Sequence, residues 1–469
     1  MLKHAAYPTL AEGVRHVAAA FDLRTRADST ACDRMDRAAA NGDFDLDLFE
    51  ELVQDVLYRT FESIGDEAFA NELAAIMRGW RRDYIPIVGR VSSDALPRDE
   101  LLPLLVEFVF AGWVADILRH LERNGLIRSA WMLAGAGQGL FGDRPAVPVA
   151  TVVQAFLWQY GVDANDAPGA LYPQPDDGTR DRTPEQVARW MSGASLPSLG
   201  SIRLLVATTV SRSWYCRDRW KGADVAFQRE LLIARALQYS AAAAAPYGDF
   251  LQMVRSQLQE RRLFDIGLLI SQAVYARGKP MGLSLIGLQT AQALDFEDAK
   301  TEFQLVEAEA LLEEFRAQAR ALNAPWAVEW MVSFCEARLA VWRSQFETSL
   351  QLYEQAFAAS VYRSGRDARR ILIEALALAA SLGKRTHMKR LIHQGKALDI
   401  LPNVLGDLEP QTREDRRIAE ILTKCYAPHF PRSAPRPRGS SGKGMRTAGE
   451  VRPVDAAGAR QPGTPDRLP

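Results

Sequence analysis

The chain contains few of the residues on which disulfide, metal and catalytic chemistry depend. It has four cysteines in 469 residues, Cys32, Cys216, Cys335 and Cys425, and none belongs to a C-x-x-C pair. Thiols this far apart favour buried cysteines in a reducing compartment over disulfides or a zinc site. The six histidines form no H-E-x-x-H pair, and there is no Walker loop, kinase signature or G-x-S-x-G elbow. We therefore expect no metal, no cofactor and no enzymatic activity, although catalytic groups that converge from distant positions would leave no such signature.

Net charge and long apolar runs are also lacking. The formal net charge is −1, which gives no global attraction to nucleic acid or to an anionic membrane. The most apolar stretch, Leu101–Leu121, is interrupted by Glu107 and Asp116, so it contains no uninterrupted apolar span of about 18 residues. This pattern favours a buried core helix over a membrane span. The first residues lack the apolar segment of a secretory signal, and we expect a cytoplasmic protein without a membrane partner.

Apolar periodicity typical of helices runs through most of the chain, and it predicts an all-α fold. We expect one helix at Leu10–Phe21, a helix-rich region at Asp45–Gly79 and the core helix of the N-terminal region at Leu101–Arg123. Only Tyr84–Ser93 has local strand character, and we interpret it as a loop.

Two patterns in the N-terminal region resemble ligand sites without completing them. Asp43, Asp45 and Asp47 alternate like the start of a calcium loop, but the glycine and glutamate that the loop needs at its sixth and twelfth positions are missing. A glycine-rich run at residues 135–142 follows a helical pattern rather than a strand, and no Gly-Lys-Ser/Thr follows it. We interpret the first pattern as helix capping and the second as an interdomain loop.

The most informative stretch is Thr183–Val206, which predicts two short helices joined by a tight turn. Thr183 is a suitable N-cap, with Gln186 at the position of a capping box. Gly193 suits the left-handed residue that ends the first helix, and Ser198 suits the cap of the second. The expected apolar faces of the two helices consist of Val187, Trp190, Met191, Leu199, Ile202, Leu205 and Val206.

This stretch resembles the second half of a repressor/Cro-type helix-turn-helix domain. The resemblance rests on Val187, Trp190, Gly193 and Pro197, followed by a leucine-rich helix. It implies a recognition helix that enters the major groove of DNA with its polar residues on the base edges. By donor and acceptor geometry, glutamine suits adenine and arginine suits guanine. The residues that the resemblance assigns to this role are Gln186 and Arg189, with Thr183 or Ser192 near the phosphates.

The segment before the hairpin departs from the family. The preceding helix is expected at Val149–Tyr160, where Gly161 and Val162 resemble its usual ending, but a long polar loop separates it from Thr183. Because the usual turn has three or four residues, this one carries an insertion of about twenty. The alternative interpretation is an ordinary helical hairpin in an all-α protein, with Trp190 in the core.

A local group of basic residues follows the hairpin. Asp218 is the only acidic residue among them, and Trp214, Tyr215 and Trp220 are interleaved. Such a patch suits DNA phosphates, whereas the alternative is a solvated helix end with buried aromatic residues. With Gln186, Arg189 and Ser192, the predicted DNA-binding residues are Arg203, Arg212, Arg217, Arg219 and Lys221.

From Ala223 to about Cys425 the pattern is helical, and helix breakers recur. Pro246, Pro280, Pro325 and Gly365 are separated by 34, 45 and 40 residues. Intervals of this size are typical of helix pairs stacked in an α-solenoid. The main alternative is a helical bundle without repeats.

One unit of this region, Ala337–Ala356, resembles a tetratricopeptide repeat. Small residues stand in its first helix, Phe346 begins the second, and Tyr353 is expected to pack rather than to function. Ile371–Ile392, with Gly383 at its turn, is a second and weaker unit. The resemblance implies a concave groove that binds a protein or peptide.

These patterns predict a helical N-terminal domain at residues 1–143, a helix-turn-helix-like region at 144–222 and a helical-repeat domain at 223–430. The last segment, 431–469, is rich in Pro, Gly, Ser and Arg, and we expect a disordered basic tail. The predicted function is that of a DNA-binding regulator whose helical array binds a protein or peptide partner. The alternative is a non-enzymatic interaction scaffold without DNA binding. The feature that discriminates between them is whether Gln186 and Arg189 are exposed beside the basic patch of Arg203–Lys221 or covered by neighbouring helices.

Overall fold

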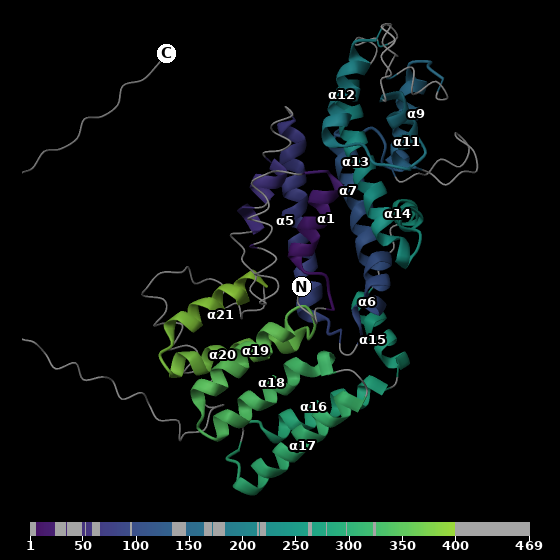
Figure 1. Ribbon diagram of the computed structural model, residues 1–469. Helices are drawn as coiled ribbons and strands as arrows, with labels where there is room; N and C mark the ends of the chain where they lie inside the picture. The colour runs from purple at the N-terminus through teal and green to yellow at the C-terminus, as the bar shows by residue number, and fades with distance from the viewer. Residues whose placement is uncertain are drawn as a thin grey trace, which may run out of the picture. The chain divides into compact units, whose positions relative to one another are not determined.

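A computed structural model describes residues 6–23, 34, 49–51, 53–58, 66–93, 96–133, 147–163, 171, 183–212, 215, 222–260, 265–277, 279–296, 298–321 and 325–398. The chain divides into two units, Met1–Ala434 and Pro435–Pro469, and all of these residues belong to the first. Every element of regular secondary structure among them is a helix (Figure 1), which confirms the all-α prediction. The tail expected at residues 431–469 lies outside the described residues.

The N-terminal region begins with the predicted helix. Helix α1 (Leu10–Ala20) starts at a capping box, in which Glu12 N donates to the Thr9 side chain and Thr9 N donates to the Glu12 carboxylate. Two orphan backbone donors of the first turn are thereby satisfied. The other N-terminal elements are the π-helical η1 (Val53–Tyr58) and η2 (Val106–Phe110), and the helices α5 (Glu67–Arg90), α6 (Arg98–Leu105), α7 (Ala111–Arg123) and α8 (Ala130–Leu133).

The interpretation of Tyr84–Ser93 as a loop is wrong for its first seven residues, because α5 continues to Arg90, and only Val91–Ser93 lie outside the helix. Tyr84, Ile85 and Val88 are buried, at the i, i+1, i+4 spacing of a helical face. The hydroxyl of Tyr84 donates to the carbonyl of Pro8 at 2.8 Å. Burial of this helical face outweighs the local strand propensity of the segment, and the helix tolerates Pro86 in its interior.

The predicted core helix is present and longer than expected. Helices α6, η2 and α7 form one continuous helical segment, Arg98–Arg123, with a π-helical stretch at Val106–Phe110 that the sequence did not indicate. Among the described residues it is the one helix with the length and hydropathy to span a membrane, and 33% of its most apolar window is buried. Its buried residues include Leu101, Leu105 and Leu118, so part of the segment contributes to the core, as predicted.

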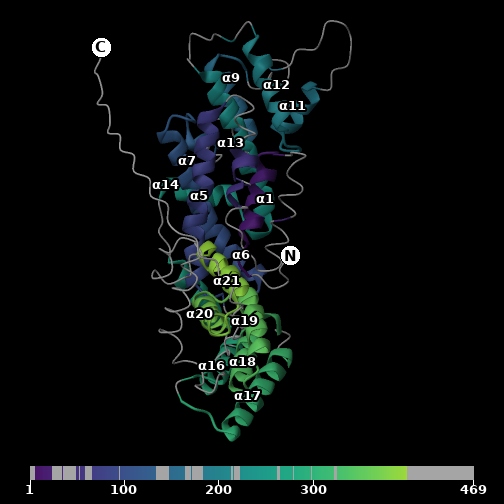
Figure 2. The same cartoon turned by 90° about the vertical axis from the view of Figure 1, so that its left-hand side faces the viewer.

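A central group of helices follows, in which α13 (Ala223–Ala244) is the shared support. Helices α1, α9 and α12 each pack against α13, and α11 packs against α9. Figure 2 shows α9, α11 and α12 together beside one end of α13. The bounds of the three smaller helices are α9 (Pro148–Gln159), α11 (Thr183–Met191) and α12 (Leu199–Val210).

The remaining helices succeed one another along the chain, with breakers where the sequence places them. Each helix from α16 to α21 packs on the next. Pro325 begins α18, Gly365 precedes α20, and Gly383 ends the turn before α21 with a left-handed φ of 67°. These elements are η4 (Ala245–Tyr247), α14 (Phe250–Gln259), α15 (Ile266–Arg277), α16 (Lys279–Ala293), α17 (Glu302–Ala321), α18 (Pro325–Trp342), α19 (Phe346–Ser360), α20 (Arg366–Ser381) and α21 (Arg385–Ala397).

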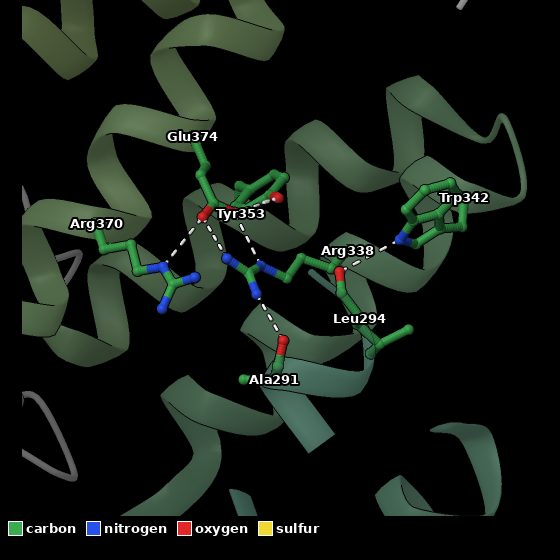
Figure 3. Close-up of polar contacts among 7 residues, drawn as sticks. All are labelled: Ala291, Leu294, Arg338, Trp342, Tyr353, Arg370 and Glu374. Atoms are coloured by element: carbon green, nitrogen blue, oxygen red, sulfur yellow. Dashed lines mark hydrogen bonds and ion pairs between the residues drawn. The ribbon is translucent and has the colours of Figure 1, made fainter. Parts of the chain in front are cut away.

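A buried ion pair holds α18, α19 and α20 together (Figure 3). Arg338 of α18 donates to the Glu374 carboxylate of α20 through Nε at 3.0 Å and Nη2 at 2.5 Å, and to the carbonyl of Ala291 through Nη1 at 2.7 Å. The Arg338 guanidinium also lies over the Phe334 ring, 4.4 Å from its centroid. Tyr353 of α19 is fully buried, as its packing role predicts. Its hydroxyl also donates to Glu374 at 2.8 Å, and burial raises the pKa of Tyr353 well above its usual value.

Candidate functional site

Helix α11 separates its residues into an apolar face and a polar one. Val187 and Trp190 are buried, with 1% and 6% of their surface exposed. Gln186 and Arg189, each directly before one of these two residues, are exposed. Neighbouring helices therefore do not cover the two residues that the resemblance assigns to base contacts.

The turn after α11 follows the predicted chemistry. Gly193 has a left-handed φ of 76°, and a Cβ added there would lie 3.3 Å from the Val147 side chain before α9. Ser198 caps α12, where its hydroxyl accepts from Ser201 N at 3.1 Å. Thr183 differs from its prediction as an N-cap, because it is already the first residue of α11. A terminus that differs by one residue leaves the faces of the helix unchanged.

The remaining predicted residues are only partly described. Ser192 is exposed just past α11, and its hydroxyl donates to the carbonyl of Arg189 at 3.1 Å. Arg203 is exposed on α12, whereas Ile202 and Leu205 on the same helix are buried. Arg212 is half-buried two residues beyond α12, and it has polar or ring contacts of its own. The other three members of the predicted basic patch, Arg217, Arg219 and Lys221, lie outside the described residues.

Arg235 of α13 fixes the hairpin to α1, a role that the sequence did not reveal. The Arg235 guanidinium is buried and donates through Nε to the carbonyl of Pro197 at 2.7 Å and through Nη1 to that of Ala19 at 2.9 Å. Asp22 lies 3.6 Å from Arg235 Nη2 and also accepts from Leu199 N, at the start of α12, at 3.2 Å. The one feature of the sequence that could have indicated this role is the position of an arginine within the apolar run LLIARALQ.

A second buried pair fixes α9 to α13. Glu230 of α13 is fully buried, and its carboxylate accepts from Arg128 Nε at 2.9 Å and from the Arg128 backbone N at 2.7 Å. Arg128 Nη1 donates to the Gln159 side chain at the end of α9 at 2.5 Å. The rings of Phe156 and Phe227 stack at 3.8 Å between the same two helices. Together these contacts give α9, which supports α11, a fixed position on α13.

A cleft of about 580 Å³ lies along α17, α18 and α19. Arg343 pairs with Glu309 at 2.7 Å, and Arg316 pairs with Glu336 and Glu313. The charged lining of the cleft is therefore mixed in sign and largely paired within the chain.

The described residues offer no sign of metal or thiol chemistry. No group of three or more His, Cys, Asp and Glu side chains within them has the arrangement of a metal site. Cys335 is buried, and burial raises the pKa of its thiol to about 12. Such a thiol is unreactive at neutral pH, and its burial agrees with the prediction of buried cysteines. Cys32, Cys216 and Cys425 lie outside the described residues.

Comparison of the chain with protein-family models, curated proteins and solved structures gives no match.

Proposed function

We propose that this protein is a DNA-binding regulator that acts in the cytoplasm and recognises DNA through α11. The observation that carries the proposal is the division of α11, with Gln186 and Arg189 exposed while Val187 and Trp190 are buried. A recognition helix needs this division, because its outer face must reach base edges while its inner face fixes its position. The competing function is that of an interaction scaffold in which the same polar residues contact only water.

Each exposed residue of the hairpin has a role that its chemistry suits. The Arg189 guanidinium can donate two hydrogen bonds to guanine, and the Gln186 amide can pair with adenine. Ser192 and Arg203 are exposed donors that suit phosphates, which position a protein on DNA without reading its sequence. The same phosphate-binding role is proposed for Arg212, Arg217, Arg219 and Lys221.

The helices α16 to α21 are proposed to form a tetratricopeptide-like solenoid that binds a protein or peptide partner. Support comes from their successive packing and from the turns at Ser344 and Gly383. The cleft along α17, α18 and α19 is the place where such a partner would lie, and its alternating carboxylates and guanidinium groups suit a segment with charges of both signs.

We expect Arg189→Ala to weaken binding to a preferred DNA duplex by about 1–3 kcal/mol, which corresponds to about 5- to 150-fold in Kd. Preference at one base pair should be relaxed, because the bidentate contact to that base is lost. Arg203→Ala should weaken binding to all DNA sequences alike. It should also reduce the slope of the logarithm of the binding constant against the logarithm of the salt concentration by about 0.9. Fluorescence anisotropy titrations at several salt concentrations measure both quantities.

Arg369→Ala is the matched control, because it removes an exposed arginine from α20 and changes the net charge equally. It should leave both the affinity and the base preference unchanged. If Arg189→Ala and Arg369→Ala behaved alike, α11 would not be a recognition helix and the scaffold function would stand.

A further inference from the structure

A cavity of about 340 Å³ is lined by residues of α1, α5, η2, α7 and α13. Protein interiors are close-packed and contain few voids larger than a water molecule. Pockets for small molecules have volumes of roughly 300–1,000 Å³ and mainly apolar walls. This cavity is partly open to solvent, and its size and lining are those of a small-molecule pocket. The wall is mainly aliphatic and aromatic, and it includes Val17, Ile76, Trp80, Trp113, Ile117 and Ala236.

Two polar pairs lie in the wall of the cavity. Arg98 Nη2 pairs with the Glu12 carboxylate at 3.1 Å. His16 Nε2 lies 2.9 Å from the Ser240 hydroxyl, and burial lowers the pKa of His16, so the ring is neutral at neutral pH. The charges at the cavity are thus balanced. Groups of this kind can hydrogen-bond a hydroxyl or carbonyl, and they do not require a charged ligand.

Two of the helices that form the cavity also support the α11–α12 hairpin. Helix α1 ends at Ala20, whose carbonyl accepts from Arg235 of α13. Arg235 in turn holds the carbonyl of Pro197, directly before α12, and Asp22 accepts from Leu199 N of α12. A shift of α1 relative to α13 would therefore alter the support of α12. A ligand that contacts both helices shifts the balance between two arrangements of α1 and α13 only if it binds one arrangement more tightly than the other.

We propose that this cavity binds a small, predominantly apolar effector that carries one neutral hydrogen-bonding group, and that α1 and α13 transmit its binding to the α11–α12 hairpin. The ligand site stands on the cavity itself, whereas its regulatory role rests on the proposed DNA-binding function. Thermodynamic linkage makes the effect reciprocal. If the effector changes the affinity of the protein for DNA by some factor, DNA changes the affinity of the protein for the effector by the same factor.

Titration with the fluorescent probe N-phenyl-1-naphthylamine tests the ligand site in the full chain. We expect saturable binding of one probe per chain, displaced by 1-decanol more effectively than by decanoate, because the site offers no unbalanced positive charge. Ala236→Phe should fill the cavity and weaken probe binding about tenfold or more. Ala242→Phe places the same ring at an exposed position of α13 and should have no effect.

Ala236→Leu provides a graded second variant, with a smaller loss of binding, if circular dichroism shows that Ala236→Phe does not fold. Absence of saturable binding, or probe binding that both cavity variants retain, would overturn the ligand site. If decanoate displaced the probe more effectively than 1-decanol, the proposal that the hydrogen-bonding group of the ligand is neutral would be overturned.

Hydrogen exchange tests the regulatory step without DNA. Saturation with 1-decanol should change amide exchange in residues 183–210 of the wild type and not of Ala236→Phe. Bound 1-decanol with unchanged exchange in these residues would overturn the regulatory role and leave the ligand site in place. If DNA binding failed while probe binding and the exchange response persisted, the proposed function would fail and the ligand-coupled hairpin would remain.

Discussion

Arg338→Met is expected to lower the free energy of unfolding by about 3–5 kcal/mol. The Arg338 side chain is 2% exposed and that of Glu374 is 12% exposed, so the substitution leaves a carboxylate with little access to water and without its principal counter-ion. It also removes the hydrogen bond to the carbonyl of Ala291 and the contact with the Phe334 ring. Urea denaturation followed by circular dichroism measures the loss.

Arg370→Met is the internal control, because Arg370 pairs with the same carboxylate at 3.3 Å from a position that is 55% exposed. An exposed pair contributes only about 0–1 kcal/mol, so this variant should resemble the wild type. If the two arginine variants lost equal stability, burial would not determine the importance of the pair, and the proposed role of Arg338 in joining three helices would be incorrect.

Arg128→Met is expected to destabilise the central helices by a similar amount, about 3–5 kcal/mol. Glu230 is fully buried, and Arg128 is its ion-pair partner. Without the guanidinium, the Glu230 carboxylate keeps only the hydrogen bond from the Arg128 backbone N. The Gln159 side chain loses its bond to Arg128 as well, so the end of α9 is released. Denaturation midpoints and hydrogen exchange in residues 148–159 report the two effects.

The double variant Arg128→Met with Glu230→Gln should recover about half or more of this loss, because removing both charges is less costly than leaving one buried and unpaired. Glutamine also keeps the acceptor for Arg128 N. Additive losses in the double variant would show that packing, rather than an unpaired charge, is responsible for the instability.

The helices of this fold were largely predictable, because apolar periodicity and breakers are local signals. Gly193 marked the C-terminal end of α11 and Gly383 the turn before α21, because a residue with left-handed backbone is required at each position. Ser198 marked the start of α12, because a capping hydroxyl is required there. Tyr84–Ser93 was predicted wrongly for the opposite reason. Its local composition favours an extended chain, and the segment is helical where burial of the face formed by Tyr84, Ile85 and Val88 outweighs that preference.

The sequence predicted the exposed residues of the candidate site, but not the buried contacts that hold the hairpin in place. The spacing of Val187 and Trp190 was enough to place Gln186 and Arg189 on the exposed face of α11. The partners of Arg235 could not be read from the sequence, because they lie 38 to 216 residues away in the chain. A charged residue in an apolar helix predicts a buried pair, but its partner becomes known only from the fold.

Selection from a pool of random-sequence DNA duplexes at physiological salt tests whether α11 reads DNA sequence. We expect the wild type to enrich a defined motif, and Arg189→Ala to enrich the same motif with preference lost at one base pair. If the wild type and Arg189→Ala both recovered a pool without enrichment, sequence recognition by α11 would be contradicted, and the protein would instead be an interaction scaffold.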